Sequence, residues 1–211
     1  QLWDYKSENP QVPDEAAVRA ALEKSGRGRV CVEGNSVCTG GTQLDLGAIA
    51  KGAVGDEVMA CLKEQGVVCA LVNLGGNILT LGEKADGSPW TIAVDSPFGE
   101  GYAGRIEVGG GKAVATSSGA QRYFEKDGVV YHHILDPETG YPARSGLASV
   151  TVIADDGLTA DALSTALFVA GEAQAARILE EQYPNVGAVL IRDDGSIRIL
   201  GDVCFTEEAG A

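Results

Sequence analysis

A series of short β-type runs, separated by Gly, Pro and Asp turns, is the feature that most constrains the fold of this chain. The runs lie at residues 78–81, 90–94, 104–108, 113–116, 123–125, 129–135 and 148–154. Strands that follow one another at such short intervals are joined by tight turns, and tight turns pair neighbouring strands antiparallel. The centre of the chain therefore predicts an antiparallel sheet.

Helical patterns lie on both sides of this region. Before it, a helix is expected to start near Asp14 and to end at Gly26, and a second covers residues 48–65. After it, two helices are expected over residues 158–170 and 172–182. Further strands are predicted at residues 29–32, 36–38, 42–46, 67–73 (a buried strand), 188–192 and 196–200. The predicted class is α+β, mainly antiparallel sheet with packed helices, in a single domain over residues 1–211 because no shift in composition marks a boundary.

The charge balance limits the kinds of partner. Sixteen Lys and Arg residues face 30 Asp and Glu residues, which gives a net charge of -14. Such a chain repels phosphate backbones and anionic lipid headgroups, so a nucleic-acid-binding role is not expected. A polyanionic small molecule would need a metal ion between it and the protein. The sequence also contains no apolar run of the roughly 18 to 20 residues that a transmembrane helix requires.

The five cysteines show neither C-x-x-C nor zinc-finger spacing. Four of them lie among apolar neighbours, where a free cysteine behaves as a small core residue, and buried thiols are therefore expected. Cys31 and Cys38 could face each other across a hairpin, but spacing alone does not establish a disulfide.

Asp161 is the most informative polar residue of the chain. It lies in the run Gly157–Ala170, where its neighbours are almost all apolar or small. An ionised carboxylate is costly there unless it is paired or bound to a cation. Thr165 follows four residues later, on the same face of the helix, and the two oxygens form a plausible partial shell for Mg²⁺. The alternative is that Asp161 caps the helix and that Thr165 bonds back to a carbonyl.

Two further segments carry groups of chemical interest. Residues 44–52, LDLGAIAKG, form a strand-to-helix turn whose backbone and lysine suit a phosphate or its bound metal; a glycine turn with a surface lysine is the alternative. The only histidines, His132 and His133, precede a tight turn, and in a strand they would point to opposite faces. Either histidine could be structural, and neither supports a zinc site. The hydroxyls of residues 116–118 lack a G-x-S-x-G elbow, so a serine hydrolase is not expected.

Taken together, five segments resemble the ApbE family, the FAD:protein FMN transferases. In order along the chain they are LDLGAIAKG at residues 44–52, ALVNLGGN at 70–77, ATSSG with RYF at 115–124, HILDPETG at 133–140 and ADALSTA at 160–166. Their order and spacing match the family over essentially the whole chain. Five ordered motifs are far more specific than any one of them.

The resemblance implies roles for individual residues. Asp161 and Thr165 match the family's magnesium ligands, and the backbone carbonyl of Ala48 is the third protein contribution. The asparagine and glycines of residues 73–76 are expected to shape the wall of the cleft.

On the flavin side, the resemblance implies that Asp45, Lys51 and Leu135 contact FAD. His133 matches a histidine near the reacting phosphate, where it could assist proton transfer from the incoming hydroxyl.

The implied reaction is a Mg²⁺-dependent transfer of FMN from FAD. A Thr or Ser hydroxyl of a target flavoprotein attacks the FMN-side phosphorus, and AMP leaves. The implied target is a flavin-carrying subunit of a membrane redox complex. Because family members are usually exported and lipid-anchored, an extracytoplasmic, membrane-anchored location is expected, with the anchor outside this chain.

Two other functions remain open at this stage. An FAD pyrophosphatase would use the same metal site with water as the acceptor and would yield FMN and AMP. A non-catalytic flavin-binding fragment is the other alternative. The resemblance implies an N-terminal segment, with strands and FAD contacts, before the motif seen here at Leu2-Trp3-Asp4, and these 211 residues are expected to be the part of the family domain that follows it.

Overall fold

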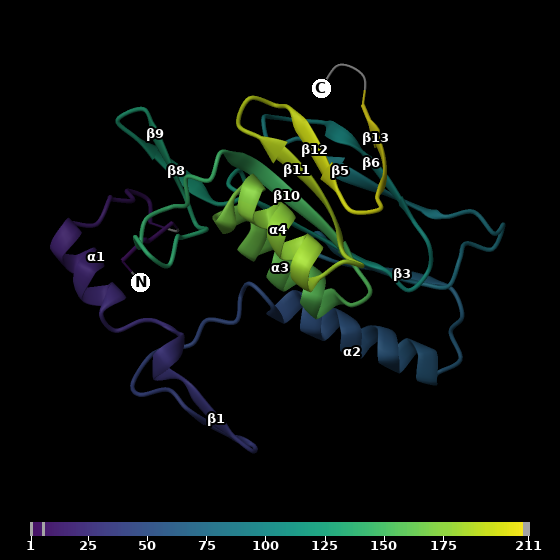
Figure 1. Ribbon diagram of the computed structural model, residues 1–211, viewed down its shortest axis with the longest axis horizontal. Helices are drawn as coiled ribbons and strands as arrows, with labels where there is room; N and C mark the ends of the chain where they lie inside the picture. Colours follow the sequence, from purple (N-terminus) through teal and green to yellow (C-terminus); the bar gives the residue numbers. More distant parts are fainter. Residues whose placement is uncertain (1, 6, 209–211) are drawn as a thin grey trace. The chain divides into compact units, whose positions relative to one another are not determined.

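The computed structural model describes residues 2–5 and 7–208, and it confirms the α+β class, with antiparallel strand pairing throughout (Figure 1). The chain forms two compact units. Unit 1 comprises Gln1–Leu46 and Gly119–Arg144, and unit 2 comprises Gly47–Ser118 and Ser145–Ala211. Each unit is built from two separate stretches of sequence, which explains why no single shift in composition marks a boundary.

Unit 2 is built around a six-stranded sheet in the order β12-β11-β10-β7-β4-β3. The strands are β3 (Ala70–Leu74), β4 (Asn77–Leu81), β7 (Ala113–Ser118), β10 (Leu147–Ala154), β11 (Gly187–Arg192) and β12 (Ile197–Leu200). The central strand β10 is almost entirely buried, and Val150 and Val152 have no exposed surface. Both faces of this strand are covered, since its polar residues Ser149 and Thr151 are as deeply buried as its valines.

The two faces of this sheet are covered differently. Unit 2 also contains three helices, α2 (Ala50–Glu64), α3 (Gly157–Ala170) and α4 (Glu172–Gln182). Of these, α3 packs on β7 and β10. On the opposite face, Val114 and Val189 share a core with Ile106 of a three-stranded sheet. That sheet has the order β13-β6-β5 and consists of β5 (Trp90–Asp95), β6 (Tyr102–Val108) and β13 (Cys204–Glu207). Alternate residues of β7 thus face the helices and the second sheet.

Helices α2 and α3 approach closely at two glycines. A Cβ atom added to Gly52 would lie 2.1 Å from the carbonyl oxygen of Gly157 and 2.8 Å from the Cβ of Asp161. A Cβ added to Gly157 would lie 2.6 Å from the carbonyl oxygen of Gly52. No other residue type fits this contact without a shift of one helix backbone.

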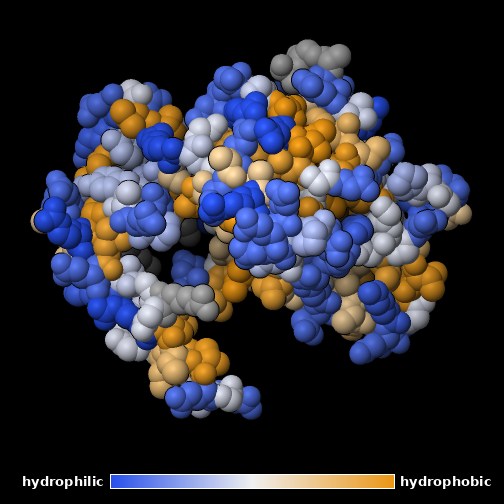
Figure 2. All heavy atoms as spheres, viewed as in Figure 1, coloured by the Kyte–Doolittle hydropathy of each residue, from blue (hydrophilic) through white to orange (hydrophobic). Residues whose placement is uncertain are grey.

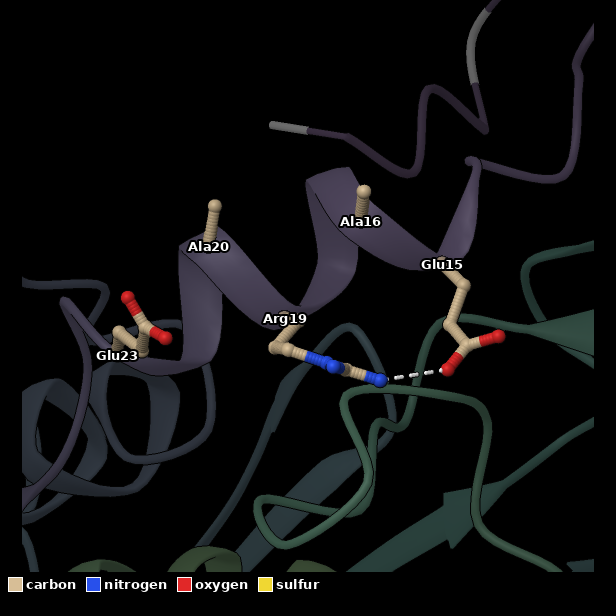
Figure 3. A pocket seen from close by; sticks show the side chains of 5 residues that line it. All are labelled: Glu15, Ala16, Arg19, Ala20 and Glu23. Atoms are coloured by element: carbon tan, nitrogen blue, oxygen red, sulfur yellow. Dashed lines mark hydrogen bonds and ion pairs between the residues drawn. The ribbon is translucent and has the colours of Figure 1, made fainter.

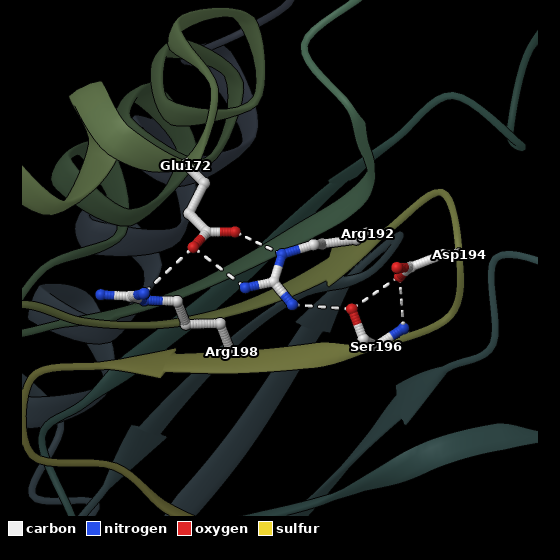
Figure 4. A network of polar contacts seen from close by, with 5 residues as sticks. All are labelled: Glu172, Arg192, Asp194, Ser196 and Arg198. Carbon is white, nitrogen blue, oxygen red and sulfur yellow. Dashed lines mark hydrogen bonds and ion pairs between the residues drawn. The ribbon is translucent and has the colours of Figure 1, made fainter.

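An ion-pair network links the start of α4 to strands β11 and β12 at one edge of the sheet (Figure 4). The carboxylate of Glu172 accepts hydrogen bonds from Arg192 Nε and Nη2 and pairs with Arg198 Nη1 at 3.1 Å. The β11–β12 turn is held by Asp194, whose carboxylate accepts from the backbone N–H and the hydroxyl of Ser196. The hydrogen bond from Arg192 is the main cause that lowers the pKa of Glu172.

Unit 1 contains a helix and two separate hairpins. Its elements are α1 (Glu15–Leu22), a 3₁₀ turn η1 (Arg27–Arg29), β1 (Cys31–Glu33) paired with β2 (Ser36–Cys38), and β8 (Tyr123–Lys126) paired with β9 (Val129–His132). Asp14 caps α1, and its carboxylate accepts the N–H of Ala17 at 3.0 Å. This confirms the predicted start of the first helix.

An aromatic cluster joins the N-terminal residues to the β8–β9 hairpin. Its rings belong to Trp3, Tyr5, Phe124, Tyr131 and Tyr141, with centroids 5.3 to 6.3 Å apart. The Trp3 indole N–H donates to the carbonyl of Gly140 at 2.9 Å, and the Tyr5 hydroxyl donates to the carbonyl of His132 at 2.8 Å. Burial raises the pKa of Tyr5 to about 12.

The structure corrects several predictions. Residues 42–46 form no strand: their alternating pattern finds no partner strand, and Leu44 and Leu46 are exposed. The strand predicted to be buried near residue 70 is the edge strand β3, and Leu71 is exposed. The strand β13 was not predicted, because its four residues near the C-terminus include a glutamate and show little alternation.

The prediction of buried cysteines is also wrong, because all five are exposed and free. Apolar neighbours in sequence do not imply burial on a two-stranded hairpin or an edge strand, where the cysteines of β1, β2 and β13 lie. Cys31 and Cys38 do stand opposite each other in the hairpin register. That hairpin also shows hydrophobic atoms at the surface (Figure 2), since Val32 and Val37 are exposed.

Among the described residues, no helix has both the length and the apolar character needed to cross a membrane.

The close contact of α2 and α3 leads to a stability prediction. We expect Gly52→Ala to lower the free energy of unfolding by about 1 to 3 kcal/mol, because the added methyl group overlaps the backbone of Gly157. Chemical denaturation measures this change. Gly55→Ala is the control, because there a Cβ meets only the flexible end of Leu79, and its cost should be smaller. A Gly52→Ala protein as stable as the wild type would contradict the contact.

The Glu172 network leads to a prediction about pH. Since the pKa of Glu172 is lowered from its ordinary value of 4.5, its contribution to stability is present above that value and disappears as the pH falls through the lowered pKa. Glu172→Gln should therefore destabilise the protein at pH 7, and the difference from wild type should shrink under acid conditions. Thermal unfolding across this range tests the prediction, and a difference that is independent of pH would contradict it.

Candidate functional site

Asp161 is a buried carboxylate without a cationic partner. It lies in the second turn of α3 and is 5% exposed. Its Oδ2 accepts the backbone N–H of Gly52 at 2.9 Å, whereas no described residue donates a hydrogen bond to Oδ1. None of the ion pairs among the described residues includes Asp161. A carboxylate in this environment needs a positive charge, so the site fits a bound metal cation.

The helix-capping alternative for Asp161 is wrong. The N-cap of α3 is Asp156, whose carboxylate accepts the N–H of Thr159 at 2.7 Å. Asp161 lies inside its own helix and instead satisfies an N–H in the first turn of α2, whose N-cap residue Ile49 makes no side-chain hydrogen bond. The first turn of one helix is therefore stabilised by a carboxylate from the other.

Thr165 lies one helical turn beyond Asp161. Its hydroxyl is 3.0 Å from the hydroxyl of Ser117 on β7, which is also 2.9 Å from that of Ser164. Ser164 in turn donates to the carbonyl of Asp161 at 2.9 Å. The structure therefore shows Thr165 bonded to a neighbouring strand, and not back to a carbonyl of its own helix. This chain of hydroxyls fixes the orientation of the Thr165 oxygen.

Residues 44–52, which include the two glycines and the lysine, reach Asp161 through Gly52. Residues 47–49 form a turn immediately before α2, with Ala48 exposed and Lys51 half-buried in the first helical turn. The hydrogen bond from Gly52 to Asp161 brings this segment to α3. Two of the motifs found in the sequence, 109 residues apart at this contact, thus form one site in unit 2.

The donor atoms favour a hard cation. No group of three or more His, Cys, Asp or Glu side chains in the described part of the chain is arranged to hold a metal. The set suggested by the sequence instead combines one carboxylate, one hydroxyl and the backbone carbonyl of Ala48. Oxygen ligands with a single carboxylate suit Mg²⁺, which leaves its other positions to water and substrate phosphate.

The other predicted residues belong to unit 1. His133 directly follows β9, is half-buried, and donates its backbone N–H to the carbonyl of Arg122 at 3.0 Å. Leu135 forms an isolated bridge with Pro142, and Asp45 lies in the exposed stretch before α2. The structure thus places His133 and Leu135 on one segment of unit 1.

The two histidines have different environments, although β9 ends at His132 and the two do not share a strand as predicted. His132 ends β9, is 7% exposed, and its Nε2 lies 3.1 Å from the carbonyl oxygen of Ala143. A Cβ added to Gly119 would lie 2.9 Å from its ring. These contacts are typical of a structural histidine and leave His133 as the candidate for chemistry.

Residues 73–76 form the hairpin turn between β3 and β4. Asn73 accepts the N–H of Gly76 at 2.9 Å, and Gly75 and Gly76 have positive φ angles of 62° and 95°. Their observed role is to build this turn.

A groove along α1 carries no comparable chemistry (Figure 3). It is lined by Glu15, Ala16, Arg19, Ala20 and Glu23. Arg19 is already paired with Glu15 at 2.8 Å, and both side chains are largely exposed.

Sequence reasoning missed two contributors to the site in unit 2. Ser117 was noted as one of three hydroxyls after a strand and as part of the ATSSG segment, but its contact with the Thr165 hydroxyl was not predicted. Asp56, one turn after Gly52 on α2, accepts the N–H groups of Gly157 and Leu158. The four-residue spacing of Gly52 and Asp56 was the available signal, because it places both on one face of the helix.

The comparison with known proteins agrees with this geometry. Residues 1–190 match the ApbE family. The chain is 39% identical to an FAD:protein FMN transferase of Klebsiella pneumoniae (strain 342), with 93% of this chain and 61% of that protein covered. It is 36% identical to one of Treponema pallidum (strain Nichols), with 93% and 59% covered. The chain thus spans about three fifths of the length of these relatives.

Solved structures show the same fold. The crystal structure of the ApbE protein of Thermotoga maritima superposes with a TM-score of 0.84 at 39% identity, covering 94% of this chain and 66% of that one. The flavinyl transferase ApbE of Pseudomonas stutzeri gives 0.76 at 34% identity, with 98% and 63% covered. By sequence and by fold, the chain belongs to the ApbE family.

Proposed function

We propose that the protein containing this chain transfers FMN from FAD to a Thr or Ser hydroxyl of a target flavoprotein, with Mg²⁺, and releases AMP. The observation that carries the proposal is the buried carboxylate of Asp161, which has no cationic partner and lies one turn from the hydroxyl of Thr165. The names of the relatives, FAD:protein FMN transferase, supply the reaction class.

In this proposal, Asp161, Thr165 and the carbonyl of Ala48 hold the metal. The bound Mg²⁺ would neutralise the charge of the FAD pyrophosphate during phosphoryl transfer. The N–H of Gly52 fixes Asp161 Oδ2 and leaves Oδ1 for the cation. Ser117 orients the hydroxyl of Thr165. A bound metal would also reduce the repulsion between the protein and the pyrophosphate, because a chain with a net charge of -14 binds a pyrophosphate poorly without a cation.

The remaining predicted residues act on the flavin nucleotide. Asp45, Lys51 and Leu135 would contact FAD, with the ammonium of Lys51 facing its negative charge. His133 would accept the proton of the attacking hydroxyl. These assignments are supported by the motifs in which the residues lie and by the half-buried position of His133.

The acceptor and the location are also part of the proposal. We propose a flavin-carrying subunit of a membrane redox complex as the target, and an extracytoplasmic site of action with a lipid anchor outside these residues. Both are supported by the family resemblance.

The direct test incubates the full-length protein with FAD and Mg²⁺, with and without an acceptor protein that carries a flavinylation-type Thr motif. We expect AMP and covalently bound flavin only when the acceptor is present. AMP without the acceptor would identify an FAD pyrophosphatase instead. No product in either mixture would contradict the proposal.

Asp161→Ala tests the metal site. We expect loss of Mg²⁺ binding and a fall in turnover on the order of 100-fold or more, because the only carboxylate ligand is removed. Calorimetry and AMP release measure the two effects. Asp155→Ala is the matched control, since Asp155 lies just before α3 but is exposed and paired with Lys112. Mg²⁺-dependent turnover retained by Asp161→Ala would refute the assignment.

His133→Ala tests the proton acceptor. Removal of a general base lowers kcat by about 10² to 10⁴, while Mg²⁺ affinity should stay unchanged because His133 is not a proposed metal ligand. Steady-state kinetics at saturating FAD and a Mg²⁺ titration separate these effects. A variant with wild-type kcat would rule out this role.

A further inference from the structure

Two carboxylates link α2 and α3 in a reciprocal way. Asp161 of α3 accepts the N–H of Gly52 in the first turn of α2 at 2.9 Å. Asp56 of α2 accepts the N–H groups of Gly157 at 2.6 Å and Leu158 at 2.9 Å, at the start of α3. Each helix therefore supplies an acceptor for unpaired N–H groups at the start of the other.

The four residues of this contact repeat the same spacing on both helices. Gly52 and Asp56 are four residues apart on α2, and Gly157 and Asp161 are four residues apart on α3, so each pair lies on one helical face. The glycines allow the two backbones to meet, and on either side of this contact a carboxylate accepts a backbone N–H group of the opposite helix.

Capping alone does not explain Asp56. The start of α3 already has its own cap, because Asp156 accepts the N–H of Thr159. Asp56 differs in that it reaches across from α2 and uses both of its oxygens, Oδ1 on Gly157 and Oδ2 on Leu158. With both oxygens engaged and the positive end of the α3 dipole beside it, Asp56 is held as an acceptor of these N–H groups.

We propose that Asp56 is a positioning residue for the metal site: it fixes the start of α3 against α2, and so fixes where Asp161 presents its free oxygen. This inference rests on the proposed function. The proposed ligands come from two separate elements, since Ala48 lies in the turn before α2 whereas Asp161 and Thr165 belong to α3. Their oxygens can surround one ion only if the spacing of the helices is fixed to within about 0.5 Å.

The consequence for Asp161 follows from the stiffness of a helix. Gly157 is one turn before Asp161, so a shift of the start of α3 moves the carboxylate with it. The same shift would lengthen the bond between Asp161 Oδ2 and Gly52. Loss of Asp56 therefore weakens metal binding without removing any ligand.

The test compares Mg²⁺ binding by calorimetry, with MgCl₂ alone as the titrant, in full-length wild type, Asp56→Ala and Asp156→Ala. Both substitutions remove a capping carboxylate from the same end of α3, so both should lower thermal stability, by about 1 kcal/mol for a cap. Only Asp56→Ala should weaken Mg²⁺ binding, by about tenfold, the loss typical when a residue that orients a metal ligand is removed.

Asp56→Asn guards against a variant that fails to fold. Its amide keeps one acceptor oxygen and should give a smaller weakening in the same direction. In both Asp56 variants, turnover should recover at high Mg²⁺, with KM for FAD unchanged.

The outcomes separate this inference from the proposed function. If wild type binds Mg²⁺, Asp161→Ala does not, and Asp56→Ala binds as tightly as wild type, only the positioning role of Asp56 is refuted. If Asp156→Ala weakens binding as much as Asp56→Ala does, the effect comes from general destabilisation and the inference is also refuted. If wild type binds no Mg²⁺, both the inference and the proposed metal site fail.

Discussion

The close approach of α2 and α3 is the constraint on which the rest of the site depends. It is possible only because Gly52 and Gly157 have no side chains at the point where the two backbones meet. The same contact brings the N–H of Gly52 to the carboxylate of Asp161, which would otherwise be a buried charge with no partner. The packing of the two helices therefore also fixes the orientation of the Asp161 carboxylate.

The sheet orients the second oxygen of the candidate site, the hydroxyl of Thr165. Strand β7 lies under α3, and Ser117 from that strand holds the hydroxyls of Ser164 and Thr165. Thr165 is thereby oriented from the sheet side, while Asp161 is oriented from the α2 side. A neutral hydroxyl and a single carboxylate carry little negative charge together, and such oxygen donors are of the kind that hard cations prefer.

Much of this could be predicted from sequence, for identifiable reasons. The four helices and most strands were located because their apolar spacing is regular, and Asp161 stood out because a carboxylate in an apolar run needs an explanation. Exposure was predicted poorly: cysteines with apolar neighbours and β3 were expected to be buried, because neighbours along the chain do not reveal which strands lie at an edge. Asp56 was missed because its partners lie 101 and 102 residues away.

We propose that the oxygens of Asp161 and Thr165 form a metal site in this member of the ApbE family. Anomalous diffraction from crystals of the full-length protein soaked with Mn²⁺, which accepts the same oxygen ligands as Mg²⁺, tests it most directly. We expect an anomalous peak about 2.1 Å from Asp161 Oδ1 and from Thr165 Oγ1. Ordered crystals with no peak at these atoms, or with Mn²⁺ bound only elsewhere, would contradict it.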